Sequence, residues 1–137
     1  MIETGLRRSL RRGHISFKLA GREPSSENLH EWRKRVKDLW HHLQLICPKP
    51  PADIRMFIAH LALLGGQLGE EHNLYLLSQF VKENSSPAER RALNQLIDAR
   101  QKKLRVASLK LGVLVFKKSS TVVCHRLKCH WLGCGKN

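Results

Sequence analysis

The sequence has few aromatic side chains and no long apolar run, and each shortage excludes a class of protein. Aromatic residues make up 6% of the chain, too few for a module that recognises single-stranded nucleic acid by stacking on its bases. No stretch approaches the roughly 18 apolar residues that a membrane span requires. The start, MIETGLRR, has an acid at Glu3 and no apolar core, so we expect no secretory signal. These absences predict a cytoplasmic protein.

Cysteines are also scarce. The chain has 4 cysteines, too few and too clustered for a disulfide framework, so we expect reduced thiols. Cys124, Cys129 and Cys134 follow one another at a spacing of five residues, and the first two precede histidines. A step of five rotates by about 140° on a helix, so the thiols do not share a face, and paired zinc ligands usually lie closer in sequence. We expect no metal site and no other cofactor.

Carboxylates are outnumbered and unevenly placed. The 137 residues include 25 Lys and Arg but only 11 Asp and Glu, giving a formal net charge of +14, while 42% of residues are hydrophobic. Residues 1–52 carry 11 basic and 5 acidic side chains, residues 53–98 carry 4 and 6, and residues 99–137 carry 10 and none. The cations after Asp98 therefore have no local carboxylates to pair with. A folded domain with this charge is expected to bind a polyanion.

Hydrophobic periodicity is helical along nearly the whole chain, and the length suits one domain over residues 1–137. We predict an all-α fold, a short-looped antiparallel bundle of about four to six helices. The predicted helices cover approximately residues 4–20, 25–46, 52–67, 70–82, 87–116 and 119–132.

Local signals set several of these boundaries. Ser25 and Ser26 are candidate N-caps, and the Pro48, Pro50, Pro51 cluster stops the helix that follows them. Glycines predict a kink or break between residues 67 and 70; they are Gly65, Gly66 and Gly69. The stretch just before them, residues 57–64, is apolar nearly all round and is expected to lie in the core.

The helix over residues 25–46 carries a basic stripe. At about 100° per residue, one arc collects five side chains: His30, Arg33, Lys34, Lys37 and His41. Glu31 and Asp38 fall outside that arc. The stripe is about 16 Å long, so it could follow a linear chain of phosphates. A solvated basic face with no ligand is the alternative that the pattern leaves open.

The long helix that follows the Asn84–Pro87 loop has one cation in an unusual place. Its apolar stripe consists of Leu93, Leu96, Ile97, Leu104, Ala107, Leu111 and Leu114. On a helical wheel Arg100 falls inside this stripe, and Lys103 and Lys110 fall at its edge. Because a buried Arg needs a partner, Arg100 is either an inward-facing phosphate ligand, a snorkelling side chain, or one half of a salt bridge to Asp38 or Glu71.

Two segments resemble a known family. LHEWRKRVKDLWHHLQLI and the later LGEEHNLYLL are similar to the conserved histidine α-helical domain, or CHAD, and the flanks GLRRSLRRG and RLKCHW resemble those of its C-terminal half. The resemblance implies an all-α fold of two similar four-helix bundles, of which this chain holds one, and a basic cleft that binds inorganic polyphosphate. It assigns the ligand role to His30, Arg33, Lys34 and Lys37, with His72 as a further candidate; His41, Arg100 and Lys103 come from the helical pattern.

We therefore expect a non-catalytic module that binds polyphosphate. The sequence shows no nucleotide-binding loop of the G-x-x-x-x-G-K-[ST] type and no H-E-x-x-H motif, so we expect no enzyme. The expected partners are polyphosphate and a second CHAD half, which could be another copy of this chain; we expect no membrane partner and a cytoplasmic location, with polyphosphate granules as one possible site of association. Two alternatives to polyphosphate binding stay open and are less favoured. One is a helical module that binds the RNA or DNA backbone, and the other is a scaffold subunit that docks an acidic protein.

Overall fold

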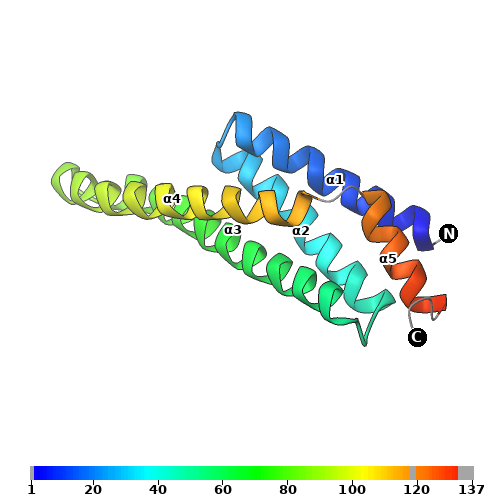
Figure 1. The fold of residues 1–137 in the computed structure, drawn as a ribbon. Coiled ribbons are helices and arrows are strands. Elements are labelled where there is room, and N and C mark those ends of the chain that lie inside the picture. Colours follow the sequence, from blue (N-terminus) through cyan, green and yellow to red (C-terminus); the bar gives the residue numbers. More distant parts are fainter. Residues whose placement is uncertain (1, 118–119, 133–137) are drawn as a thin grey trace.

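The computed structural model describes residues 2–117 and 120–132, and within these ranges every regular element is a helix (Figure 1). The five helices are α1 (Ile2–Arg22), α2 (Ser26–Ile46), α3 (Ala52–Asn84), α4 (Pro87–Phe116) and α5 (Ser120–Leu132). The prediction of an all-α helical bundle is confirmed.

Helix α1 packs against α2, α2 against α3 and α3 against α4, and α1 also contacts α4. Short α5 lies against α1 at the end of the bundle where α1 begins (Figure 1). Arg126 of α5 pairs with Asp53 of α3, with 2.7 Å between Nε and Oδ2, and this hydrogen bond holds the pKa of Asp53 below its usual value. The α3–α4 pair is longer than its neighbours and projects from the bundle as a hairpin (Figure 1).

The helix boundaries follow local capping chemistry. The Ser25 side chain accepts a hydrogen bond from the backbone N–H of Asn28 and so caps α2. Ser86 and Glu89 form a reciprocal capping box at the start of α4, with Pro87 in the first turn. Helix α1 is longer than predicted by two residues at each end, a difference typical of helix ends.

The predicted break near the glycines is wrong, because α3 runs without interruption from Ala52 to Asn84. A glycine inside a helix costs only about 1 kcal/mol relative to alanine. Here α2 packs over the glycines: a Cβ on Gly65 would lie 3.8 Å from Cγ1 of Val36, and a Cβ on Gly69 would lie 3.1 Å from Nε of Arg33. The approach of α2 is close only at Gly69, because 3.8 Å is an ordinary van der Waals contact and a Cβ on Gly66 would meet nothing within 4 Å.

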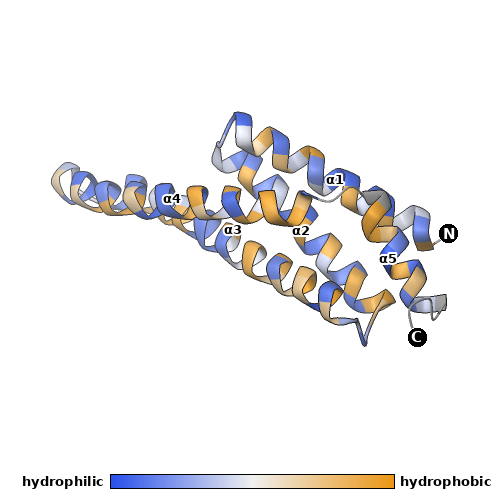
Figure 2. Ribbon diagram, in the orientation of Figure 1, coloured by the Kyte–Doolittle hydropathy of each residue, from blue (hydrophilic) through white to orange (hydrophobic). Residues whose placement is uncertain are grey.

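The core takes residues from all five helices, and a cluster of aromatic rings lies where α1, α2 and α4 meet. Phe17 of α1 stacks on Phe116 of α4 with 5.6 Å between ring centroids, and it lies 5.3 Å from the ring of Trp32. Gly112 of α4 makes room for these rings, because a Cβ there would lie 2.6 Å from Cε2 of Phe17. Figure 2 shows the apolar residues of α1 and α2 alternating with polar ones around each helix, as an amphipathic bundle requires.

Two apolar segments are less buried than their patterns predict. In α3, Met56 and Leu63 are exposed although the stretch around them is apolar on all sides, so only one face of that stretch lies in the core. In α4 the buried face is rotated from the predicted stripe: it includes Gln101 and Ser108, and three leucines of the stripe are exposed, namely Leu93, Leu96 and Leu114.

One carboxylate is buried among three helices. Glu71 of α3 is 1% exposed, and its Oε1 accepts hydrogen bonds from Ser26 of α2 and from Gln101 and Arg105 of α4. The distance from Nη2 of Arg105 to Oε1 is 3.0 Å. Glu71 therefore joins the start of α2 to the middle of the α3–α4 hairpin.

Among the residues that the structure describes, none of the helices has the length and apolar character needed to cross a membrane.

Candidate anion-binding site

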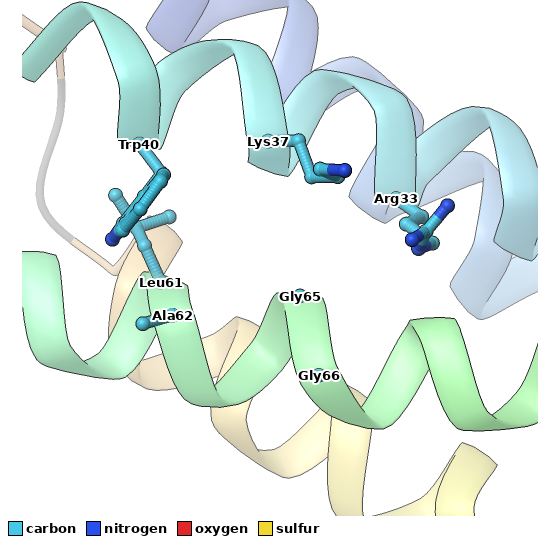
Figure 3. A pocket seen from close by; sticks show the side chains of 7 residues that line it. All are labelled: Arg33, Lys37, Trp40, Leu61, Ala62, Gly65 and Gly66. Atoms are coloured by element: carbon cyan, nitrogen blue, oxygen red, sulfur yellow. The ribbon is translucent and has the colours of Figure 1, made fainter.

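A groove of about 260 Å³ runs between α2 and α3 on the outside of the bundle (Figure 3). Helix α2 contributes Arg33, Lys37 and Trp40, and α3 contributes Leu61, Ala62, Gly65 and Gly66. In Figure 3 the side chains of Arg33 and Lys37 extend from α2 over the two glycines of α3, which have no side chains to fill the space. The groove is therefore a shallow channel with cations along one wall and bare helix backbone along the other.

The two cations of the groove have no carboxylate partner among the described residues. The ion pairs of α2 involve other side chains: Arg35 pairs with Glu31 at 2.7 Å and with Asp38 at 3.6 Å. Through these pairs, Glu31 and Asp38 both lie beside Arg35. Arg33 and Lys37 thus keep their charge free for an anion from outside the chain.

Two histidines stack about one helical turn beyond Arg33, outside the set of residues that line the groove. His30 of α2 and His72 of α3 have ring centroids 3.9 Å apart and planes that differ by 19°. The Nδ1 atoms of both rings and Nε of Arg33 are buried and have no hydrogen-bond partner among the described residues. Such buried polar atoms are uncommon in folded proteins, and these three lie together beside the groove.

Burial and the neighbouring basic side chains both lower the pKa of His30. Desolvation is the main cause that lowers the pKa of His30 below its usual value, and the nearby His72, Lys34 and Arg33 lower it further, while Glu31 raises it slightly. The empty site therefore favours the neutral form of His30. An anion bound beside the ring would oppose this effect and favour the imidazolium.

The remaining predicted residues of the α2 stripe lie at the margin of the groove. Lys34 is exposed, and its Nζ lies 3.7 Å from Oε2 of Glu31. His41 is also exposed, and its ring meets the ring of Trp40 edge to face at a centroid distance of 4.9 Å. Neither residue lines the groove, although both lie on the α2 face that borders it.

Arg100 and Lys103 lie elsewhere, and the inward orientation considered for Arg100 is wrong. Arg100 is exposed on α4 and pairs with Glu70 of α3, with 2.8 Å between Nη2 and Oε1; this pairing lowers the pKa of Glu70. The partner is neither Asp38 nor Glu71, because the buried face of α4 is rotated and Arg105 takes the place beside Glu71. Lys103 is exposed on α4 and does not line the groove.

The cysteines of α5 are not arranged together. Cys124 is buried, which raises the pKa of its thiol, whereas Cys129 is half-buried with its sulfur 3.6 Å from Nε2 of His125. Cys134 lies outside the described residues. Among the described residues, no group of three or more His, Cys, Asp or Glu side chains could hold a metal ion.

The periodicity of α2 did not identify the opposite wall of the groove. The glycines, which predict a helix break in the sequence, have another role: Gly65 and Gly66 line the groove with Arg33 and Lys37, and Gly69 lies beside Arg33. A signal for this role exists in the sequence, because Gly65, Gly69 and His72 recur at helical spacing and so share one face of α3. Trp40 is half-buried at the groove and packs against the core.

Comparison with known proteins adds one match. A family model described as CHAD domain matches residues 1–82, which cover α1, α2 and nearly all of α3, and thus both walls of the groove. The closing RLKCHW segment lies outside the matched range. No curated protein and no solved structure matches the chain.

Proposed function

Because the chain belongs to the CHAD domain family, we propose that it binds inorganic polyphosphate in the groove between α2 and α3 and does so without catalysing a reaction. The observation that carries this proposal is the pair of cations Arg33 and Lys37, which line the groove with the glycines of α3 and have no carboxylate partner in the described part of the chain. Polyphosphate is a family expectation that fits this geometry, since it is a linear anion with a charge on every unit.

The spacing of the donors suits a chain rather than a single phosphate. His30, Arg33 and Lys37 follow one another by three or four residues, so they rise along α2 by about 5 Å each. Guanidinium and ammonium groups would hold successive phosphate oxygens through charge-assisted hydrogen bonds. His30 and His72 would bind the end of the segment in the groove, and Lys34 and His41 could contact phosphates along its edge.

The groove has few aromatic side chains that could stack on a nucleic-acid base. Of the residues that line it, only Trp40 is aromatic, whereas modules that bind single-stranded nucleic acid stack successive bases on several rings. This favours an anion without bases over RNA or DNA. The proposal includes a cytoplasmic location, where polyphosphate granules would be a source of the ligand, and a second copy of the chain or another CHAD half as partner.

A salt-dependent titration with long-chain polyphosphate tests the function. For a site with two or three phosphate contacts, the logarithm of the affinity should fall with the logarithm of salt concentration with a slope of about −1.5 to −2. RNA at matched phosphate should compete at least about 10-fold less well at physiological salt. Equal competition by RNA would reduce the proposal to non-specific electrostatic binding, and the absence of binding at low salt would refute it.

The affinity should also depend on pH. The lowered pKa of His30 means that the empty folded protein takes up this proton at a lower pH than the unfolded chain does. Bound phosphate favours the proton, so affinity should rise as pH falls from about 8 to 5.5, with most of the gain below the ordinary histidine pKa of about 6.5. Without ligand, the same shift should lower stability as pH falls through that range, because the unfolded chain then binds more protons.

Calorimetric titration at pH 6 in two buffers of different ionisation enthalpy would measure the proton uptake on binding. The variant His30→Gln keeps a polar side chain but cannot take up the proton, so it should lose most of the pH dependence while retaining much of the affinity at pH 8. An unchanged pH profile in this variant would exclude His30 from the site.

A further inference from the structure

The projecting end of the α3–α4 hairpin is apolar on its surface. Arg33 lies opposite Gly69 and His30 opposite His72, and the same antiparallel register places Ser26, the first residue of α2, opposite Leu76. Residues 77–84 of α3 therefore extend past the end of α2, by about 12 Å. Five large apolar side chains of this part of the hairpin are exposed: Leu76, Leu77, Phe80, Leu93 and Leu96.

These side chains are more exposed than the hairpin needs for its own packing. Phe80 is 62% exposed and Leu96 is 70% exposed, whereas Val81 and Ile97, which follow them directly, are 4% and 5% exposed. Each helix thus has a buried apolar side towards the other helix and a second apolar side towards solvent. A cluster of exposed large apolar residues on a projecting element is typical of an interaction surface.

The charge of the hairpin indicates what covers this surface. Residues 76–98 carry three basic and three acidic side chains, for a net charge of zero, within a chain of +14. The charged residues are Lys82, Arg90, Arg91, Glu83, Glu89 and Asp98, and among the described residues none of the six forms an ion pair within the chain. A second copy can therefore approach this end without the repulsion that the rest of the surface would impose, and opposite charges are available to pair across the contact.

We propose that the end of the α3–α4 hairpin, residues 76–98, is a dimerisation surface that packs against the same surface of a second copy. A two-fold axis would bring the two hairpins together as four helices, with Phe80 and Leu96 of each copy at the centre. The apolar residues of α3 and those of α4 recur at intervals of three or four, which places each set on one side of its helix, as such packing requires.

The dimer also bears on the groove, and this part rests on the proposed function. Gly65, Gly69, His72, Leu76 and Phe80 follow one another at helical spacing, so the wall of the groove and the apolar end share one face of α3. A second copy on Leu76 and Phe80 would stand beside the end of the groove where His30 and His72 stack. The two copies would then hold their grooves on either side of the contact.

The variant Phe80→Glu tests the surface, with Ile15→Glu as its matched control. Ile15 is 57% exposed on α1, so both variants replace a similarly exposed apolar side chain by the same acid. Light scattering at about 100 μM protein should give twice the 15.8 kDa chain mass for the wild type and for Ile15→Glu, and the single-chain mass for Phe80→Glu. Raising the salt concentration should leave the dimer intact, since an apolar, charge-balanced contact does not weaken as polyanion binding does.

A second variant, Leu96→Glu, should give the same monomer from the other helix, and an unchanged helical circular dichroism spectrum would show that both variants fold. A monomeric wild type, or a dimer that persists in both variants, would overturn the proposal. Neither result tests whether a single groove binds phosphate, because binding of tripolyphosphate, which one groove can hold, is expected to stay within about twofold in the monomeric variants. A wild-type protein that does not bind tripolyphosphate would instead contradict the proposed function.

Discussion

Replacing Arg33 and Lys37 together with alanine is expected to weaken polyphosphate binding by about 100-fold at physiological salt. Both side chains line the groove, and neither has a carboxylate partner among the described residues. A hydrogen bond to a charged group contributes about 1.5–3 kcal/mol, so the loss of two such contacts amounts to about 3 kcal/mol, which is a factor of about 100. The slope of affinity against salt should become shallower by about 1.4, because two phosphate contacts are removed.

The double variant Arg8→Ala with Arg12→Ala is the matched control. These arginines are exposed on α1, outside the groove, and their removal lowers the net charge by the same two units. Binding to the control should fall by less than about threefold, since distant exposed charges are screened by salt. Similar losses in the two variants would mean that total charge rather than the groove binds the polyanion, and the proposed site would have to be abandoned.

Replacing Glu71 with alanine is expected to lower the free energy of unfolding by about 3 kcal/mol, since removing one partner of a buried pair leaves the other without compensation. Arg105 and Gln101 would lose their hydrogen bonds to Oε1, and Ser26 would lose its contact at the start of α2. Urea unfolding followed by circular dichroism would measure the change as a lower midpoint with an unchanged slope.

Glu70→Ala is the natural comparison, because the two glutamates are adjacent and each pairs with an arginine of α4. The side chain of Glu70 is 46% exposed and that of Glu71 is 1% exposed. An exposed ion pair contributes little to stability, so Glu70→Ala should shift the urea midpoint much less than Glu71→Ala. If the two variants were equally stable, the buried carboxylate would not be what ties α2 to the hairpin.

The features that depend on neighbouring residues in the sequence were predictable from the sequence. Ser25 caps α2, and the prolines after Cys47 end it, because capping and the missing N–H of proline act within one turn. The basic stripe of α2 was also predictable, since its side chains share a face once the helix is known. Asp38 pairs with Arg35, outside the stripe, whereas Glu31 pairs with Arg35 and also with Lys34 of the stripe.

Sequence reasoning failed where the outcome depends on a neighbouring helix. The glycines of α3 would break an isolated helix more readily than a packed one, and the packing of α2 over them was not visible in the sequence. Arg100 lies within the apolar stripe by angle, but that stripe includes Leu96 and Leu114, which are exposed. A prediction from periodicity treats every apolar residue as buried. Where apolar residues face solvent, the predicted stripe is therefore rotated from the face that is actually buried.

The pairing of His30 with His72 could not be derived from periodicity at all. The two residues are far apart in sequence, and only the register between α2 and α3 brings their rings to 3.9 Å. The family resemblance pointed to both residues without saying that they meet. Their contact is therefore a result of tertiary structure, as is the choice of Arg105 rather than Arg100 as partner of Glu71.

The unbroken course of α3 has a consequence for which polyphosphates are held most tightly. Its 33 residues form a rod about 50 Å long that carries the groove near its middle and the dimer surface at its end. With no hinge between them, two joined copies would hold their grooves at a fixed separation. A polymer long enough to span that separation would bind both grooves at a high effective concentration, whereas a shorter one would bind only one. The length of α3 would thus set a minimum length of polyphosphate. Above that length the affinity would rise because one polymer binds both grooves, although the contacts in each groove stay the same.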